Sequence, residues 1–297
     1  MPESPAIIVQ LLGGLGNQLF QYAMGRCLAE RNRAVLKLDI TAFQDYTLRS
    51  YALQHFNVAV EFATPKEVAA SSAIVEKGHD FNGDTLSILP PAFLTGYWQS
   101  EKYFKEIEPI LRKELTLKEP LEGEDLKVAR AIESCESVSL HVRRGDYVTN
   151  SHTNQFHGTC SLAYYRKCLA LLRQSVRDPA LFVFSDDPQW VADNMKFDLP
   201  ATYVNHNPPE KHYADLRLMG LCRHNILANS SFSWWGAWLN ANPSKRVYAP
   251  LRWYADYRIK TPDLIPPGWT RVDNLDFPRW AGQISMRIRN RLRRMLP

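Results

Sequence analysis

The strand, glycine turn and helix at the start of the chain constrain its fold more than any other stretch. Residues 6–12 are mostly apolar, as in a buried strand, and residues 13–16 read G-G-L-G. From Asn17 onward, apolar residues recur with helical spacing, and a second short strand at residues 34–38 ends in Asp39. This order of strand, helix and strand predicts a Rossmann-type α/β domain with a parallel sheet.

The same glycine turn leaves a dinucleotide-binding alternative open. Gly14 and Gly16, with an acid about 20 residues later, match part of the NAD-binding fingerprint, but Leu19 stands where the fingerprint has its third glycine. Asn17 and Gln18 follow at the helix start, where side-chain amides can donate and accept hydrogen bonds. A plain N-cap is the alternative interpretation of Asn17.

The charged stretch His141–Asp146 reads H-V-R-R-G-D and directly follows the apolar run at residues 138–140. Its arginines therefore lie at the carboxyl end of a predicted strand, where open α/β sheets bind their ligands. The planar guanidinium suits phosphate oxygens, so a nucleoside diphosphate is the natural partner. Alternation along the strand favours Arg143 as the phosphate ligand and Arg144 as a brace against a neighbouring acid. A structural ion pair with Asp146 is the alternative.

Two further predicted strands also end in polar residues. The strand at residues 180–184 leads into Asp186 and Asp187, which suit either a metal or the cap of the next helix. The strand at residues 225–228 leads into Asn229–Ser233, where hydroxyls and free helix N–H groups favour an anion. No two aspartates are separated by a single residue, so arginine rather than metal is expected to neutralise the phosphates.

A polar stretch with proline and glycine at residues 119–125 indicates a domain boundary. We predict an N-terminal domain at residues 1–122, a C-terminal domain at 123–283 and a tail at 284–297. The five cysteines contain no C-x-x-C pair, which indicates neither a disulfide framework nor a zinc site. No apolar run is long enough to span a bilayer and no basic signal-peptide region begins the chain, so a cytoplasmic location is expected.

The net charge of +5 arises from the tail. Residues 284–297 hold five arginines and no acid, and the remaining 31 basic residues balance the 31 acids. Nucleic acid is therefore not an expected partner. The apolar residues of the tail fall on one helical face, which suggests peripheral contact with the inner face of an anionic membrane; an ordinary terminal helix is the alternative.

Four motifs occur in the order seen in the α-1,2-fucosyltransferases of glycosyltransferase family 11. The chain resembles that family from about residue 7 to about residue 255, through the motifs Gly13–Tyr22, His141–Val148, Phe184–Asp187 and Asn229–Trp235. The resemblance implies a GT-B-like α/β fold, in which two Rossmann-type domains face a cleft. It also implies inverting transfer of L-fucose from GDP-β-L-fucose to the 2-hydroxyl of a terminal galactose, in the synthesis of a surface polysaccharide or an oligosaccharide.

The resemblance further implies roles for individual residues. Arg143 resembles the arginine that holds the donor diphosphate, and Asn17 the amide that faces the reacting centre. Gln18 and Trp98 are expected on the acceptor side, although the aromatic stretch around Trp98 is explained equally well as core. The residues expected to bind the donor are His141, Arg143, Arg144, Asp186, Asp215, Ser230, Ser231, Phe232 and Ser233.

Inverting transfer needs a base for the acceptor hydroxyl and a group that stabilises the departing diphosphate. Arg143 and the turn at residues 231–233 supply the second. Asp146 is the predicted base, because it is the carboxylate nearest in sequence to the proposed phosphate site; holding Arg143 or Arg144 is its alternative role. No cofactor or metal is expected beside the donor. A non-catalytic protein that binds GDP-sugars or glycans, and a transferase for another GDP-sugar, are the alternative functions.

Overall fold

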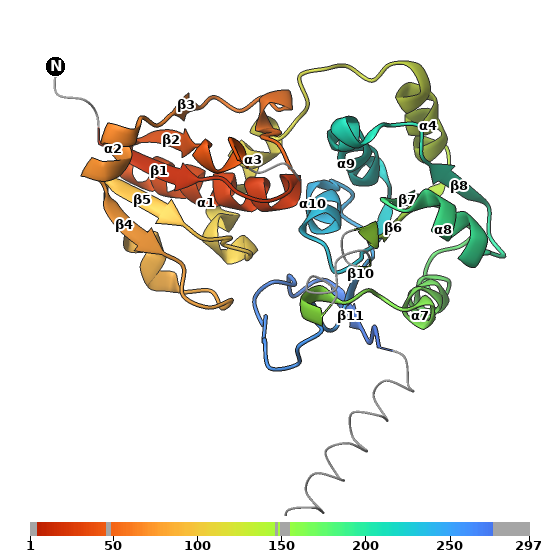
Figure 1. Cartoon of the computed structure of the whole chain (residues 1–297). Coiled ribbons are helices and arrows are strands. Elements are labelled where there is room, and N and C mark those ends of the chain that lie inside the picture. The colour runs from red at the N-terminus through yellow and green to blue at the C-terminus, as the bar shows by residue number, and fades with distance from the viewer. Residues whose placement is uncertain (1–4, 46–48, 146–147, 149–154, 276–297) are drawn as a thin grey trace, which may run out of the picture.

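The computed structural model describes residues 5–45, 49–145, 148 and 155–275 and contains two parallel β-sheets, each accompanied by helices (Figure 1). The predicted α/β class with two Rossmann-type sheets is confirmed. One sheet is built before residue 96 and the other after residue 135, so they fall on either side of the predicted boundary at residue 122. The boundary itself stays a prediction.

The N-terminal sheet has the order β3-β2-β1-β5-β4, and all its pairings are parallel. The strand order in this sheet changes direction at β1, which pairs with β2 on one side and with β5 on the other. The turn that follows β1 therefore opens at the switch point, where open α/β sheets leave a crevice for ligands. The strands are β1 (Ala6–Gln10), β2 (Val35–Asp39), β3 (Glu61–Phe62), β4 (Ser72–Val75) and β5 (Ala92–Thr95).

The C-terminal sheet has the order β11-β10-β9-β6-β7-β8 and is also parallel throughout. Its switch point lies between β6 and β9. The strands that carry the H-V-R-R-G-D stretch and the serine turn are thus direct neighbours. The strands are β6 (Glu136–Val142), β7 (Pro179–Ser185), β8 (Ala201–Val204), β9 (His224–Ile226), β10 (Val247–Pro250) and β11 (Thr270–Val272).

An α-helix or a 3₁₀ turn lies in most of the connections between successive parallel strands, whereas residues 251–269, between β10 and β11, contain no helix. The α-helices are α1 (Leu15–Asn32), α2 (Pro65–Ala70), α3 (Glu108–Glu114), α4 (Gly123–Glu133), α7 (Leu162–Leu172), α8 (Pro188–Asn194), α9 (His212–Leu221) and α10 (Ser231–Leu239). The 3₁₀ turns are η1 (Thr41–Phe43), η2 (Leu53–His55), η3 (Gly83–Ser87), η4 (Glu101–Tyr103), η5 (Lys105–Ile107) and η6 (Pro209–Lys211).

The two halves share one core, in which α10 of the C-terminal half packs against α1 of the N-terminal half (Figure 1). Ring centroids of Phe20 on α1 lie 4.5 Å from Trp234 and 5.1 Å from Trp235 on α10. Trp235 also stacks on Phe104 at 5.4 Å. Because each of these large rings is at least 98% buried, the contact removes much apolar surface from water and fixes how α1 and α10 meet.

Candidate active site

The helices that follow the two switch points meet at their N-terminal ends. A Cβ atom placed on Gly16 in the first turn of α1 would lie 2.4 Å from the carbonyl carbon of Ser231 and 2.5 Å from the nitrogen of Phe232. Only glycine allows this approach. The N-caps of the two helices, Gly14 and Ser230, make no side-chain capping bond. Two helix N-termini, each with a partial positive charge, therefore converge at the junction of the sheets.

Asn17 joins the two helix ends. Its Oδ1 accepts a hydrogen bond of 2.9 Å from Ser231 Oγ and another of 2.9 Å from Gln99 Nε2. The N-cap alternative for Asn17 is wrong, because α1 begins two residues earlier at Leu15. Both hydrogen bonds use the side-chain oxygen of Asn17. The side-chain nitrogen, Nδ2, is the donor group of this amide.

The two arginines of the H-V-R-R-G-D stretch lie past the end of β6, which stops at Val142. Arg143 Nη1 forms an ion pair with Asp186 Oδ2 at 2.8 Å. Arg144 is braced by an acid as expected: its Nε lies 3.2 Å from Asp187 Oδ2, and its guanidinium carbon lies 3.7 Å from the ring centre of Trp190. The two side chains thus have different surroundings. Arg144 is held between an acid, Asp187, and an aromatic ring, Trp190, which indicates a structural role.

Asp186 and Asp187 are both accounted for by contacts within the protein. Asp187 Oδ1 accepts from the backbone N–H of Trp190 and caps α8, as one of the two interpretations expected. Asp186 Oδ1 accepts from the backbone N–H of Arg144 at 2.8 Å, while its other oxygen pairs with Arg143. A Cβ on Gly145 would lie 2.3 Å from Asp186 Oδ2, so this glycine lets the carboxylate approach. The described residues contain no cluster of histidine, cysteine or acidic side chains that could hold a metal.

His141 presents an unsatisfied polar atom at this junction. The residue is 5% exposed, and its Nδ1 is buried without a hydrogen-bond partner in the described part of the chain. Burial, reinforced by the nearby charge of Arg143, lowers the pKa of His141 to about 3, so the imidazole is neutral at physiological pH. Its ring centroid lies 5.6 Å from that of Phe232 in the first turn of α10. An orphaned buried nitrogen beside a helix N-terminus is typical of a site that a polar ligand completes.

Two residues of the site were not anticipated from the sequence. His212, at the start of α9, has its ring 6.2 Å from that of Phe232. Burial lowers its pKa, and the positive charges that add to this effect belong to Arg49, His55 and Arg143. Arg49 also lies beside the glycine turn, since a Cβ on Gly14 would be 3.5 Å from its Nε. The site therefore gathers arginines from both halves of the protein.

The serine turn at residues 230–233 differs from expectation in how its hydroxyl groups are used. The hydroxyl of Ser233 donates to the carbonyls of Ala228 and Ser230, at 3.2 and 3.1 Å, and that of Ser231 donates to Asn17. These hydroxyl protons are therefore engaged within the protein. The donors that this turn keeps for an anion are the backbone N–H groups at the start of α10, rather than the hydroxyls of Ser231 and Ser233.

Asp215, one of the residues expected to bind the donor, lies in the first turn of α9, which begins at His212. Its Oδ1 accepts a 2.8 Å hydrogen bond from Asn207 Nδ2, which also donates to Asp125 Oδ1 at 2.9 Å. Burial is the main reason that the pKa of Asp215 rises from 3.8 to about 6, and the charge of Asp125 adds to the rise.

The raised pKa predicts how Asp215→Asn changes the dependence of stability on pH. Between its unfolded value near 3.8 and its folded value of about 6, native Asp215 keeps a proton that the unfolded chain releases. The stability of the parent protein relative to Asp215→Asn should therefore fall as pH rises from 4 to 6 and stay level above that. Urea unfolding at pH 4.5 and 7.5 measures the difference; equal values at both would contradict the assignment.

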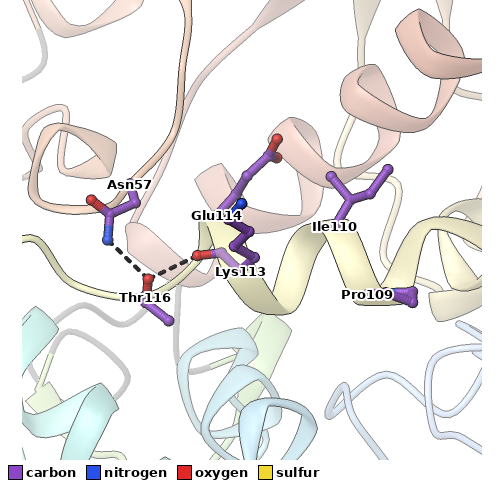
Figure 2. A pocket seen from close by; sticks show the side chains of 6 residues that line it. All are labelled: Asn57, Pro109, Ile110, Lys113, Glu114 and Thr116. Carbon is purple, nitrogen blue, oxygen red and sulfur yellow. Dashed lines mark hydrogen bonds between the residues drawn. The ribbon is translucent and has the colours of Figure 1, made fainter.

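One hollow among the described residues lies away from this junction. It has a volume of about 690 Å³ and contains Glu114, whose carboxylate is engaged by Tyr22 and Arg26 at 2.7 and 3.0 Å. Figure 2 shows its lining with Asn57 hydrogen-bonded to Thr116. No predicted site residue belongs to it. The hollow is lined by Asn57, Pro109, Ile110, Lys113, Glu114 and Thr116.

Comparison with known proteins decides the family. The profile described as Glycosyl transferase family 11 matches residues 7–273. The chain belongs to glycosyl transferase family 11. The protein is therefore a glycosyltransferase, and its resemblance to this family in four separate motifs is confirmed over nearly the whole chain.

The relatives of this chain differ in the sugar that their names specify. An Escherichia coli alpha-1,2-colitosyltransferase is 31% identical, over 90% of this chain and 99% of its own. A Caenorhabditis elegans galactoside 2-alpha-L-fucosyltransferase is 26% identical, over 90% and 79% respectively. A solved GDP complex of an Arabidopsis thaliana FUT1 mutant covers 84% of this chain and 71% of that chain, at 13% identity and a TM-score of 0.50. The fold of this family 11 protein is GT-B-like, as predicted.

Both residues expected on the acceptor side of this family 11 enzyme lie in the interior instead. Gln18 has no exposed surface: its Nε2 donates to the carbonyls of Gly13 and Ser50, and its Oε1 accepts from the N–H of Ala52. Trp98 is 1% exposed and packs edge-on against another core ring. Gln18 therefore positions the segment after Arg49, and the core explanation of Trp98 is the one that the structure supports.

Two expectations fall outside the described residues. The predicted base Asp146 is one of them, and its role stays a prediction. The tail at residues 284–297 is the other. Among the described residues, no helix has the length and apolar character needed to cross a membrane.

Proposed function

We propose that this protein is an inverting α-1,2-fucosyltransferase, which moves L-fucose from GDP-β-L-fucose to the 2-hydroxyl of a terminal galactose in a glycan. The observation that carries the proposal is the junction of α1 and α10. Two helix N-termini, Arg143 and the orphaned Nδ1 of His141 gather there, beside the switch point of the C-terminal sheet. A diphosphate satisfies these groups together, because it supplies negative charge and several hydrogen-bond acceptors.

Residues of both halves have a part in the proposed reaction. The acceptor oxygen attacks C1 of fucose on the face opposite GDP, the bond from C1 to the phosphate oxygen breaks, and its electron pair leaves with the diphosphate. Arg143 and the N–H groups of α10 stabilise that charge. Asp146 is the proposed acceptor of the hydroxyl proton. Asn17, held by Ser231 and Gln99, presents its Nδ2 toward the reacting centre.

In the proposed arrangement, the N-terminal half binds the acceptor and the C-terminal half binds GDP. His141, Arg143, Asp215 and the first turn of α10 all belong to residues 123–283, which supports this division. We further propose a cytoplasmic enzyme of surface polysaccharide or oligosaccharide synthesis, with the tail at residues 284–297 contacting the inner face of a bacterial membrane.

The second candidate function is transfer of colitose, which is L-fucose without its 3-hydroxyl. The E. coli alpha-1,2-colitosyltransferase, 31% identical over 90% of this chain, is the observation that favours it. A site that hydrogen-bonds the 3-hydroxyl of fucose would reject colitose by several orders of magnitude, whereas an apolar site would discriminate weakly. The two donors therefore need direct comparison.

Incubation of the protein with GDP-fucose and lactose tests the proposal. GDP is expected to be released much faster with both substrates than with GDP-fucose alone, and the product should show an α-1,2 linkage to galactose by NMR. Parallel reactions with GDP-colitose and GDP-mannose identify the sugar. GDP binding without transfer from any donor would instead indicate a non-catalytic GDP-sugar-binding protein.

A further inference from the structure

A group of aromatic side chains from both halves meets beside the loop that leads into α10. The aromatic platform consists of His79, Tyr97, Phe156, His157 and Tyr254. Tyr254 is its centre, with ring centroids 4.9 Å from Phe156, 5.2 Å from His79 and 5.5 Å from His157. Loops after β4 and β5 supply two of the five residues, and the C-terminal half supplies the other three.

The loops of the aromatic platform are tied directly to the active-site residues. Asn229, two residues before α10, donates from Nδ2 to the carbonyls of His157, Gly158 and Trp253, at 3.0, 3.2 and 3.1 Å. The N–H of Ala255 donates to the carbonyl of Phe156 at 2.9 Å. The platform is therefore held in a fixed position relative to the N-terminus of α10.

Hydrogen bonds within the N-terminal half also hold Tyr97 of the aromatic platform in position. Glu76 accepts hydrogen bonds from the backbone N–H groups of Tyr97 and Trp98, at 2.7 and 3.0 Å, and so holds the turn that presents Tyr97. Two residues later Gln99 binds Asn17. Tyr97 thus lies on the same short segment as a residue that contacts the proposed reacting centre.

The aromatic platform offers both apolar ring faces and polar atoms. Phe156 is 38% exposed and Tyr97 is 41% exposed, whereas Tyr254 beneath is 8% exposed. Burial is the main reason that the pKa of Tyr254 is raised to about 12, and the neighbouring Tyr97 and Glu76 add to it, which keeps its hydroxyl a neutral donor. A pyranose ring matches such a surface, because it has an apolar C–H face and a rim of hydroxyls.

We propose that the aromatic platform is the subsite for the acceptor glycan, whose terminal pyranose stacks on Phe156 and Tyr97. The inference rests on the proposed function. It replaces the buried Trp98 with the exposed ring of its neighbour Tyr97 and with that of Phe156. The 2-hydroxyl of the stacked sugar would then face Asn17 and the donor carbon, while GDP occupies the far side of the junction.

Phe156→Ala and Tyr97→Ala test the proposal, with Phe62→Ala as the matched control. Phe62 is 51% exposed on β3 at the opposite edge of the N-terminal sheet. Loss of a stacking ring should raise the acceptor KM roughly tenfold or more for Phe156→Ala and Tyr97→Ala. The KM for GDP-fucose and the Kd for GDP should stay within about twofold of the parent values, as should every constant of Phe62→Ala.

Saturation-transfer NMR with a panel of galactose-terminated oligosaccharides, in the presence of GDP, separates this proposal from the proposed function. Saccharide binding that Phe156→Ala abolishes supports the aromatic platform even if the parent transfers no fucose, in which case the proposed function alone fails. An unchanged acceptor KM in an active Phe156→Ala enzyme overturns the platform alone. Absence of saccharide binding to the parent protein overturns both.

Discussion

Arg143→Ala is expected to lower kcat with GDP-fucose by roughly 10²–10³-fold, the scale found when a preorganised charge stabiliser is removed. Arg143 lies just past the carboxyl end of β6, and its 2.8 Å ion pair with Asp186 holds its guanidinium there. Charge on the departing diphosphate grows in the transition state. The loss should therefore fall on kcat more than on the KM for the donor.

Arg173→Ala is the control for this substitution. Arg173 also forms a 2.8 Å ion pair with an aspartate, Asp198, but it is the C-cap of α7, and the two side chains are 40% and 77% exposed. An exposed pair of this kind contributes little to stability, so kinetics and melting temperature should remain close to those of the parent. Steady-state kinetics with quantified GDP release make the comparison. Unchanged kcat in folded Arg143→Ala would refute its role in leaving-group stabilisation.

Gly16→Ala is expected to reduce both stability and activity, because the new methyl group meets backbone rather than a movable side chain. The methyl carbon would lie 2.4 Å from the carbonyl carbon of Ser231, so α1 and α10 must separate. Overpacking of this kind typically destabilises by about 1–3 kcal/mol. Displacement of the two helix ends by about 1 Å should lower kcat/KM by on the order of 100-fold.

Gly83→Ala provides a matched glycine substitution at a tolerant position. A Cβ on Gly83 would be no closer than 3.6 Å to its nearest neighbours, which are atoms of the Phe81 ring. Thermal melting and kcat/KM should both stay near the parent values. If Gly16→Ala behaves like Gly83→Ala in both measurements, the contact between α1 and α10 is not required for catalysis.

The elements of this fold were predictable where a short apolar run is followed by polar or glycine residues. Parallel strands buried on both faces produce such runs, and their carboxyl ends carry the ligand-binding residues. Residues 138–140 and 180–184 thus predicted β6 and β7, and the register of these strands places Arg143 close to Asp186. The argument from alternating side chains does not apply to Arg143 and Arg144, because β6 ends at Val142, before either arginine.

The residues that escaped prediction reach the site through long-range contacts. Arg49 lies in a stretch without a clear pattern, and it approaches Gly14 because Gln18 binds the backbone at Ser50 and Ala52. Tyr97 and Trp98 are adjacent aromatics, and only the turn held by Glu76 decides that the first is exposed and the second is buried. Local sequence patterns carry no information about such tertiary contacts.

A crystal structure of the protein with GDP tests the central proposal most directly. The account predicts that the β-phosphate lies within hydrogen-bond distance of the Arg143 guanidinium and of a backbone N–H in the first turn of α10, with His141 Nδ1 satisfied by the ligand. A diphosphate bound elsewhere, with no contact to the Arg143 guanidinium or to His141 Nδ1, would contradict it.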